Sequence, residues 1–130
     1  MKSLLITLVA AVCFLLGDVF SEERYTTKYD DVDIDAVLRS DRLLNVYVNC
    51  LLDLGACPPD AAELKRNLPD ALANDCAACS EKQKEIANKF THYLIDHRES
   101  DWDLLEEKYD PTGAYRERYL RDQDKKETAE

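Results

Sequence analysis

Residues 50–79 read CLLDLGACPPDAAELKRNLPDALANDCAAC and place four cysteines at the spacing C-x6-C-x18-C-x2-C. Four cysteines allow three disulfide pairings. Cys50 and Cys57 flank the end of an expected helix and its turn, where a local bridge is easy to build. Cys76 and Cys79 are three residues apart, and a helical turn at that spacing also brings two sulfurs together. We therefore favour pairing each cysteine with its neighbour in the chain, as Cys50–Cys57 and Cys76–Cys79.

Bridges of this kind close small loops. The loss of chain entropy in such loops stabilises a fold by about 2 to 2.5 kcal/mol each, less than long loops would. Because each bridge holds only the turn between two helices, the helices themselves stay free to shift against one another.

The fifth cysteine, Cys13, lies in an N-terminal stretch with the layout of a secretory signal peptide. Lys2 provides a positive n-region, and residues 4–16 form an apolar run. Val19 and Ser21 then place small side chains at the −3 and −1 positions of a cleavage site. This order of charge, apolar run and small residues is typical of a leader that is removed on secretion.

We therefore predict a signal peptide over residues 1–21, cleaved after Ser21. A membrane anchor is the alternative, but a spanning helix needs about 20 apolar residues, and Gly17-Asp18 interrupts this run early. Cleavage removes Cys13 and leaves an even number of cysteines in a secreted, extracellular protein. In that oxidising environment, thiols become disulfides.

The expected mature chain, residues 22–130, has the length of one domain and can bury only a thin core. Its net charge stays at −10, because Lys2 and Asp18 of the leader cancel. Binding to nucleic acid or to an anionic membrane requires a basic face. We therefore expect no nucleic-acid partner and no stable membrane association.

Strand signals are nearly absent, whereas helical periodicity runs through the whole mature chain. Glycine is rare, no Asn-Gly or Asp-Gly turn occurs, and alternating apolar and polar runs are missing. The pattern predicts an all-α fold, a compact bundle of about six helices with two small-loop disulfides. The helices are expected over residues 33–38, 41–53, from 60 past 72, 80–97, from 100 to 109, and 115–121.

Several residues set the expected helix boundaries. Pro69 should kink or restart the third helix, because proline removes a backbone donor. The helix over 41–53 is apolar on nearly all sides and should be the buried, central one. Residues 22–31 are expected to lie extended over the core, and residues 122–130 to form a charged, frayed tail. The expected N-caps are Asp41, Asp60, Ser80 in a capping box with Gln83, and Ser100 with Asp103.

Chemical sites are weakly indicated. Four cysteines could hold zinc, but the six-residue gap of the first pair is wide for a zinc knuckle, and secretion favours oxidation. The C-A-A-C stretch could be a redox motif, but the βαβ units of a thioredoxin-like fold are missing.

His92 and His97 are the only histidines, and His97 falls on an apolar stripe, where a packed or half-exposed role is expected. No G-x-S-x-G, H-E-x-x-H or P-loop occurs, so we expect no enzyme, no catalytic residue, no metal and no cofactor.

The cysteine spacing and the blocks around it resemble the insect chemosensory proteins, the olfactory-segment-D-like family. The resemblance covers essentially the whole mature chain. One departure is Ala61, where the family usually has glycine, and alanine there simply favours helix. The matching blocks are Tyr25-Thr26-Thr27-Lys28-Tyr29-Asp30, Tyr47-Val48-Asn49-Cys50, Leu64-Lys65, Leu68-Pro69-Asp70-Ala71-Leu72, Trp102, and Tyr109-Asp110-Pro111-Thr112-Gly113.

The resemblance implies a six-helix bundle with the same two disulfides, and a soluble, secreted carrier of pheromones, odorants, fatty acids or cuticular lipids. In this family an apolar channel between the helices takes the ligand, with Tyr47 at its mouth or wall and Trp102 near the ligand. Burying each ligand methylene is worth about 0.8 kcal/mol. A monomer is expected, and the alternative is a structural or signalling protein of the same fold without a dedicated ligand. The candidate wall residues are Leu43, Val46, Tyr47, Leu64, Leu68, Ile86, Phe90, Leu94, Trp102 and Leu105.

Overall fold

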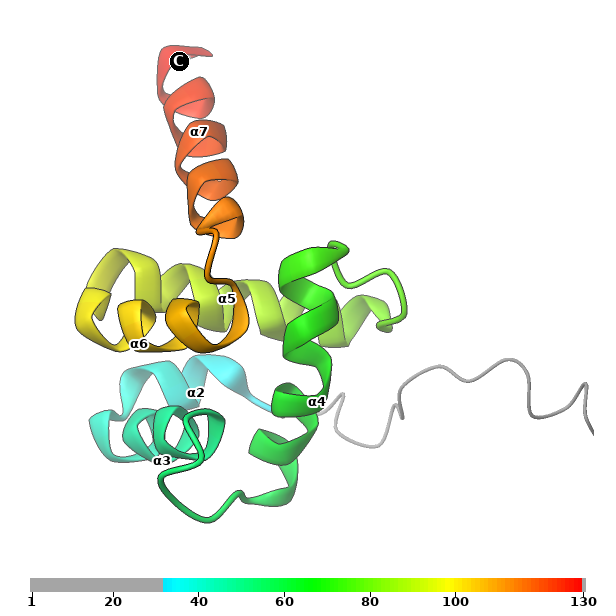
Figure 1. Cartoon of the computed structure of the whole chain (residues 1–130), viewed down its shortest axis with the longest axis vertical. Coiled ribbons are helices and arrows are strands. Elements are labelled where there is room, and N and C mark those ends of the chain that lie inside the picture. The colour runs from blue at the N-terminus through cyan, green and yellow to red at the C-terminus, as the bar shows by residue number, and fades with distance from the viewer. Residues whose placement is uncertain (1–31, 130) are drawn as a thin grey trace, which may run out of the picture.

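The computed structural model describes residues 32–129, and this part of the chain forms six helices and no strand (Figure 1). The expected all-α fold is therefore confirmed. The predicted signal peptide and the expected extended segment over 22–31 lie outside the described residues. The helices are α2 (Ile34–Arg39), α3 (Asp41–Leu51), α4 (Pro59–Ala73), α5 (Glu81–His97), α6 (Glu99–Tyr109) and α7 (Ala114–Ala129).

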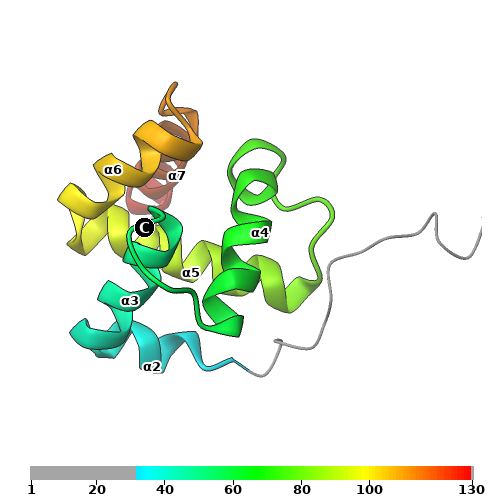
Figure 2. The same cartoon turned by 60° about the horizontal axis from the view of Figure 1, so that its bottom comes forward.

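Helix α5 is the centre of the arrangement. It contacts α2, α4 and α6, while α4 also contacts α3 and α6. Both views show α6 folding back along α5 after the single linking residue Arg98, with α4 crossing near the other end of α5 (Figures 1 and 2). No helix within residues 32–129 has the length and apolar character to cross a membrane.

The expectation that the helix over 41–53 is the buried, central one is wrong. Leu43 on α3 is 44% exposed, and Asn45 and Asn49 are also exposed, so one side of α3 faces solvent. The helix also ends earlier than expected, at Leu51. Asp53 has a φ of 61°, a left-handed conformation that stops a helix, and its carboxylate pairs with Lys65 and Lys108.

The core is a single cluster to which all six helices contribute. Burying a large apolar side chain contributes about 1.5–3 kcal/mol, so this cluster supplies most of the driving force for folding. Its largest completely buried side chains are Trp102, Phe90, Leu44, Leu51, Leu68, Leu94 and Leu105.

Both expected disulfides are present, Cys50–Cys57 and Cys76–Cys79. Their Cα atoms are 4.9 Å and 5.2 Å apart, respectively, within the usual range for a disulfide. The first joins the end of α3 to the turn before α4, and the second closes the turn between α4 and α5. The bridges therefore hold turns rather than joining distant parts of the chain.

The capping box at the start of α5 is confirmed. Ser80 Oγ accepts a hydrogen bond from the Gln83 amide at 3.1 Å, and Gln83 Oε1 accepts one from the Ser80 amide at 2.8 Å. These two bonds satisfy amides that the helix itself leaves unpaired.

The other three expected N-caps are wrong. Helix α3 is capped by Ser40, whose hydroxyl accepts from the Leu43 amide at 3.2 Å, so Asp41 lies in the first turn instead. Helix α4 starts at Pro59 without a side-chain cap, which places Asp60 inside the helix. Helix α6 follows α5 so closely that its N-cap position is Arg98, and Ser100 makes no cap.

Helix α4 does not restart at Pro69. It is assigned as one α-helix from Pro59 to Ala73, with Pro69 inside it. The proline lies on the exposed side of the helix. The core contacts of Leu68, Ala71 and Leu72 on the other side continue past it, so tertiary packing outweighs the lost backbone hydrogen bond.

Helix α7 is longer than expected. It continues past Arg121 to Ala129, so the charged residues 122–129 are helical and not a separate tail. Its C-terminal end points away from the other helices (Figure 1). Only Tyr115 and Tyr119, near its start, are buried among its described residues.

These two tyrosines dock α7 onto α5. The Tyr115 hydroxyl lies 2.8 Å from Thr91 Oγ1, and the Tyr119 hydroxyl donates to Asp96 at 2.7 Å. His92 stacks on the Tyr119 ring with centroids 4.0 Å apart. His92 is thus half-buried beneath α7.

The other histidine, His97, is not on the apolar stripe as expected. It is exposed at the C-terminal end of α5, and its ring lies 4.8 Å from that of Tyr93. The fully buried part of the stripe ends at Leu94.

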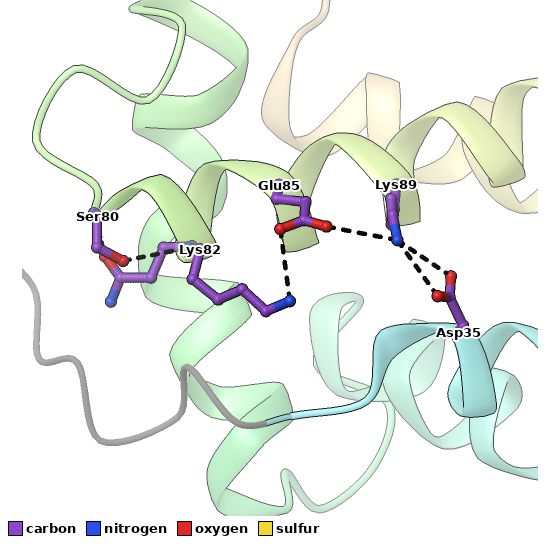
Figure 3. Close-up of polar contacts among 6 residues, drawn as sticks. Asp35, Ser80, Lys82, Glu85 and Lys89 are labelled. Atoms are coloured by element: carbon purple, nitrogen blue, oxygen red, sulfur yellow. Dashed lines mark hydrogen bonds and ion pairs between the residues drawn. The ribbon is translucent and has the colours of Figure 1, made fainter.

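On the outer side of α5, Lys89 links this helix to α2. Its Nζ lies 3.2 Å from Asp35 Oδ2 and 3.5 Å from Glu85 Oε1 (Figure 3). All three side chains are substantially exposed, and ion pairs of this kind contribute about 0–1 kcal/mol. The contact therefore helps to orient α2 rather than to stabilise the fold.

The capping box yields a stability prediction with a matched control. Ser80→Ala removes the hydroxyl that accepts from the Gln83 amide, and we expect it to lower the free energy of unfolding by about 1 kcal/mol. Ser100→Ala removes a hydroxyl that caps nothing and should change the free energy little. Urea unfolding of both variants tests this, and equal losses would show that the Ser80 bond has no special role.

The burial of His92 yields a pH prediction. Burial lowers the pKa of His92 below its ordinary value of 6.5, while the nearby Asp96 charge partly opposes this. As the pH falls through about 6.5, the unfolded chain therefore binds a proton at His92 before the folded chain does. We expect this histidine to make the fold less stable as the pH is lowered from about 7.5 to about 5.5.

His92→Phe keeps a ring against Tyr119 and should remove that part of the pH dependence, measured as urea midpoints at the two pH values. His97→Gln, at the exposed histidine, should keep it. A pH dependence that survives His92→Phe and vanishes in His97→Gln would contradict the assignment of this loss of stability to His92.

Candidate functional site

A small cleft lies where α3, α4 and α5 meet, beside Val32, two residues before the start of α2. Its volume is about 20 Å³, room for about one water molecule. One part of its wall is apolar and the other carries carboxylate and amide groups. The lining residues are Val32, Tyr47, Asp60, Glu63, Leu64, Asn67, Gln83 and Ile86.

Helix α4 supplies half of this wall from one face. Asp60, Glu63, Leu64 and Asn67 follow one another at i, i+3, i+4 and i+7, and residues at that spacing share a side of an α-helix. Three of the four are polar, although Glu63 and Asn67 are each only 3% exposed. The face that α4 turns toward the interior is therefore unusually polar at its N-terminal end.

Tyr47 connects α3 to this face. It is 3% exposed, and its hydroxyl donates a hydrogen bond to Asp60 Oδ2. Burial raises the pKa of Tyr47 well above its ordinary value, and the hydrogen bond and charge of Asp60 raise it further. The hydroxyl is therefore neutral and acts as a donor. Its ring also lies 5.9 Å from that of Phe90, which connects the cleft to the deeper core.

Glu63 is a buried carboxylate whose two oxygens both have partners. Its Oε1 accepts from Gln83 Nε2 at 3.0 Å, and its Oε2 pairs with Arg66 one turn further along α4. A buried charge is tolerated when it is paired and hydrogen-bonded in this way. This group therefore joins α4 to α5 at the wall of the cleft.

Asn67 differs from its neighbours. Its Oδ1 atom is buried and has no hydrogen-bond partner among the described residues. Most buried polar atoms in proteins are hydrogen-bonded, so an unpaired one requires an explanation.

The candidate wall residues fall into three groups. Tyr47, Leu64 and Ile86 line the cleft. Leu43 and Val46 lie elsewhere on α3: Leu43 is 44% exposed, and Val46 borders a shallow outer groove beside the first disulfide. The remaining five are completely buried in the same core cluster, and they are Leu68, Phe90, Leu94, Trp102 and Leu105.

The polar part of the cleft wall was not predicted from the sequence as a site. Asp60 and Gln83 were expected only as capping residues, and Glu63 and Asn67 were not singled out. The signal that could have found them is their spacing, because Glu63 and Asn67 share a helix face with Leu64. Polar residues on the apolar side of a helix are candidates for a buried polar site.

Metal binding has little support at the cysteines. The Asp70 carboxylate and the sulfurs of Cys76 and Cys79 lie within 4.8 Å of one another. Metals bind cysteine as the thiolate, whereas these two sulfurs are joined in a disulfide. Asp70 instead accepts a hydrogen bond from the Ala78 amide at 3.0 Å and so helps to hold the turn.

The fold and cleft define a small disulfide-linked helical bundle with an interior site, and comparison with known proteins places it in a family. The model of the insect pheromone-binding family A10/OS-D matches residues 25–117. The chain belongs to this family, and the resemblance to the insect chemosensory proteins is thereby confirmed.

Individual relatives agree. Ejaculatory bulb-specific protein 3 of Drosophila melanogaster is 46% identical over 112 residues, 86% of this chain and 89% of that protein. The putative odorant-binding protein A10 of the same species is 50% identical over 98 residues, 75% of this chain and 63% of that protein. A solved chemosensory protein in complex with bromo-dodecanol has a TM-score of 0.68 at 43% identity, covering 74% of this chain and 96% of that one.

The bond between Tyr47 and Asp60 can be measured by a double-mutant cycle. Asp60 lies in the first turn of α4, where a negative charge is favourable in its own right, so single variants mix two effects. In the cycle of Tyr47→Phe and Asp60→Ala we expect a coupling free energy of about 1–2 kcal/mol from urea unfolding. A coupling near zero would show that this hydrogen bond does not hold α3 to α4.

Proposed function

We propose that this protein is a secreted carrier of small hydrophobic molecules such as pheromones, odorants, fatty acids or cuticular lipids. The observation that carries the proposal is the cleft at Tyr47, which has an apolar wall continuous with the core, in a chain of the insect pheromone-binding family. A structural relative is described as a complex with bromo-dodecanol. The predicted signal peptide over residues 1–21 supports secretion.

The size of the cleft implies that the helices move apart when a ligand binds. Small-molecule pockets usually measure about 300–1,000 Å³, far more than the 20 Å³ present here. A twelve-carbon chain would gain about 10 kcal/mol from burial, before the costs of ordering and opening. The local disulfides allow such movement, because neither joins helices across the core.

In this proposal the alkyl chain passes the apolar wall and enters the core. Tyr47, Leu64 and Ile86 contact it first, and Phe90 follows because its ring is next to that of Tyr47. Leu68, Leu94, Trp102 and Leu105 form the deeper wall as the core opens. Val46 contributes only if ligand also occupies the outer groove, and Leu43 lines neither that groove nor the cleft.

Catalysis is not part of the proposal. Neither histidine lines the cleft, since His92 lies beneath α7 and His97 is exposed at the end of α5. The two carboxylates of the cleft are held by hydrogen bonds and an ion pair. The arrangement suits retention of a ligand rather than proton transfer to it.

A secreted structural or signalling protein of the same fold is the second candidate. The closed interior favours it, because five of the ten candidate wall residues are completely buried, as they would be in a core that only packs.

Ligand titration separates the two candidates. Trp102 is the only tryptophan in the sequence and is completely buried, so its fluorescence reports on the core. We expect dodecanol to quench this fluorescence and to displace the probe N-phenyl-1-naphthylamine, because the chain enters the core beside the tryptophan.

Tyr47→Ala should weaken binding by about tenfold, or 1.4 kcal/mol, since it removes cleft wall. Leu120→Ala, at an exposed leucine of α7, is the matched control and should bind as the natural chain does. Absence of both quenching and displacement would contradict the carrier and favour the second candidate.

A further inference from the structure

The polar part of the cleft is built mainly from hydrogen-bond acceptors. Three of these side chains are engaged as acceptors: Asp60 accepts from the Tyr47 hydroxyl, Glu63 accepts from Gln83 and Arg66, and Gln83 Oε1 accepts from the Ser80 amide. Asn67 Oδ1 differs, because it is buried and has no partner among the described residues. Asn67 as a whole is only 3% exposed. Asn67 lines the cleft, so a ligand that opens the cleft as far as this buried atom meets one vacant acceptor.

An unpaired acceptor beside an apolar channel determines which head groups fit. A group that donates a hydrogen bond satisfies Asn67 Oδ1, whereas a group that only accepts leaves it buried and unpaired, which is unfavourable. Sites built to pair a polar group discriminate strongly against analogues that cannot pair.

The charge of the cleft also affects which head groups bind. Its lining includes the carboxylates of Asp60 and Glu63, and none of its described lining residues is basic. Arg66 is already paired with Glu63, and its side chain is 57% exposed to solvent. A carboxylate ligand would therefore meet like charges, with no cation among the described lining residues to compensate them.

Building on the proposed carrier function, we propose that this cleft receives the polar end of the ligand and selects long-chain primary alcohols. The hydroxyl donates to Asn67 Oδ1, and the alkyl chain follows the apolar wall of Leu64 and Ile86 into the core. Ethers, esters and carboxylates of the same chain length bind less tightly, the first two because they cannot donate and the last because of its charge.

A matched ligand series tests this in the mature chain. Displacement of N-phenyl-1-naphthylamine is measured at about pH 7.5 with dodecanol, dodecyl methyl ether, dodecyl acetate and dodecanoate, where the carboxylate is ionised. We expect dodecanol to bind about tenfold more tightly than the ether, or 1.4 kcal/mol, and more tightly than the acetate and dodecanoate.

Two variants assign the preference to the amide. Asn67→Leu keeps a similar shape and removes the acceptor, so dodecanol and its methyl ether should bind it equally. Its thermal midpoint should not fall, because an unpaired buried group is removed. Asn49→Leu, at an exposed asparagine of α3, should keep the preference for the alcohol.

Each other outcome decides whether the alcohol preference stands. The ligand series on the natural chain tests this preference even if Asn67→Leu does not fold. If all four ligands bind with equal affinity, the carrier function stands and this inference fails. If the acetate binds more tightly than the alcohol, the Asn67 amide presents its NH₂ group to the ligand and the inference is overturned. If no ligand displaces the probe, the proposed function fails together with it.

Discussion

The hydrogen bond from Gln83 Nε2 to Glu63 Oε1 is the contact on which the cleft depends. Gln83 completes the cap of α5 with Ser80, while Glu63 lies on the interior face of α4 and pairs with Arg66. Because Glu63 and Gln83 are both buried, loss of either would leave an amide or a carboxylate without its partner in the interior. This link therefore fixes α4 against α5 at the wall of the cleft, and the apolar residues around it are free to adapt.

The disulfides complement this link because they restrain only turns. Cys50–Cys57 holds the connection from α3 to α4, and Cys76–Cys79 holds the connection from α4 to α5. In the described chain the two disulfides hold turns, and the faces of the helices contact one another only through non-covalent interactions. A bundle of this kind can widen around an alkyl chain without breaking a bond, while the polar end of the cleft keeps its geometry. The proposed carrier needs the bundle to widen so that the alkyl chain can enter, and it needs the fixed polar end to bind the head group.

Features set by neighbours in the chain were predictable from the sequence, and features set by tertiary packing were not. The disulfide pairs and the Ser80–Gln83 capping box depend on residues a few positions apart. The cap of α3 was misplaced by one residue because Ser40 and Asp41 are both good caps, and the backbone conformation decides between them. The docking of α7 through Tyr115 and Tyr119 and the burial of Asn67 depend on long-range contacts. The spacing of Asn67 from Leu64 marks it only as a candidate for burial, and the packing of α4 against α3 and α5 decides whether it is buried.

In the proposed carrier, ligand enters the interior at the cleft and places its hydroxyl beside Asn67. Isotope-filtered nuclear Overhauser measurements on the labelled mature chain with unlabelled dodecanol test it most directly. We expect contacts from the alkyl chain to Tyr47, Leu64 and Ile86, and from the carbon that carries the hydroxyl to Asn67. Contacts confined to the outer groove at Val46 and Cys57, with none to the interior side chains, would contradict it.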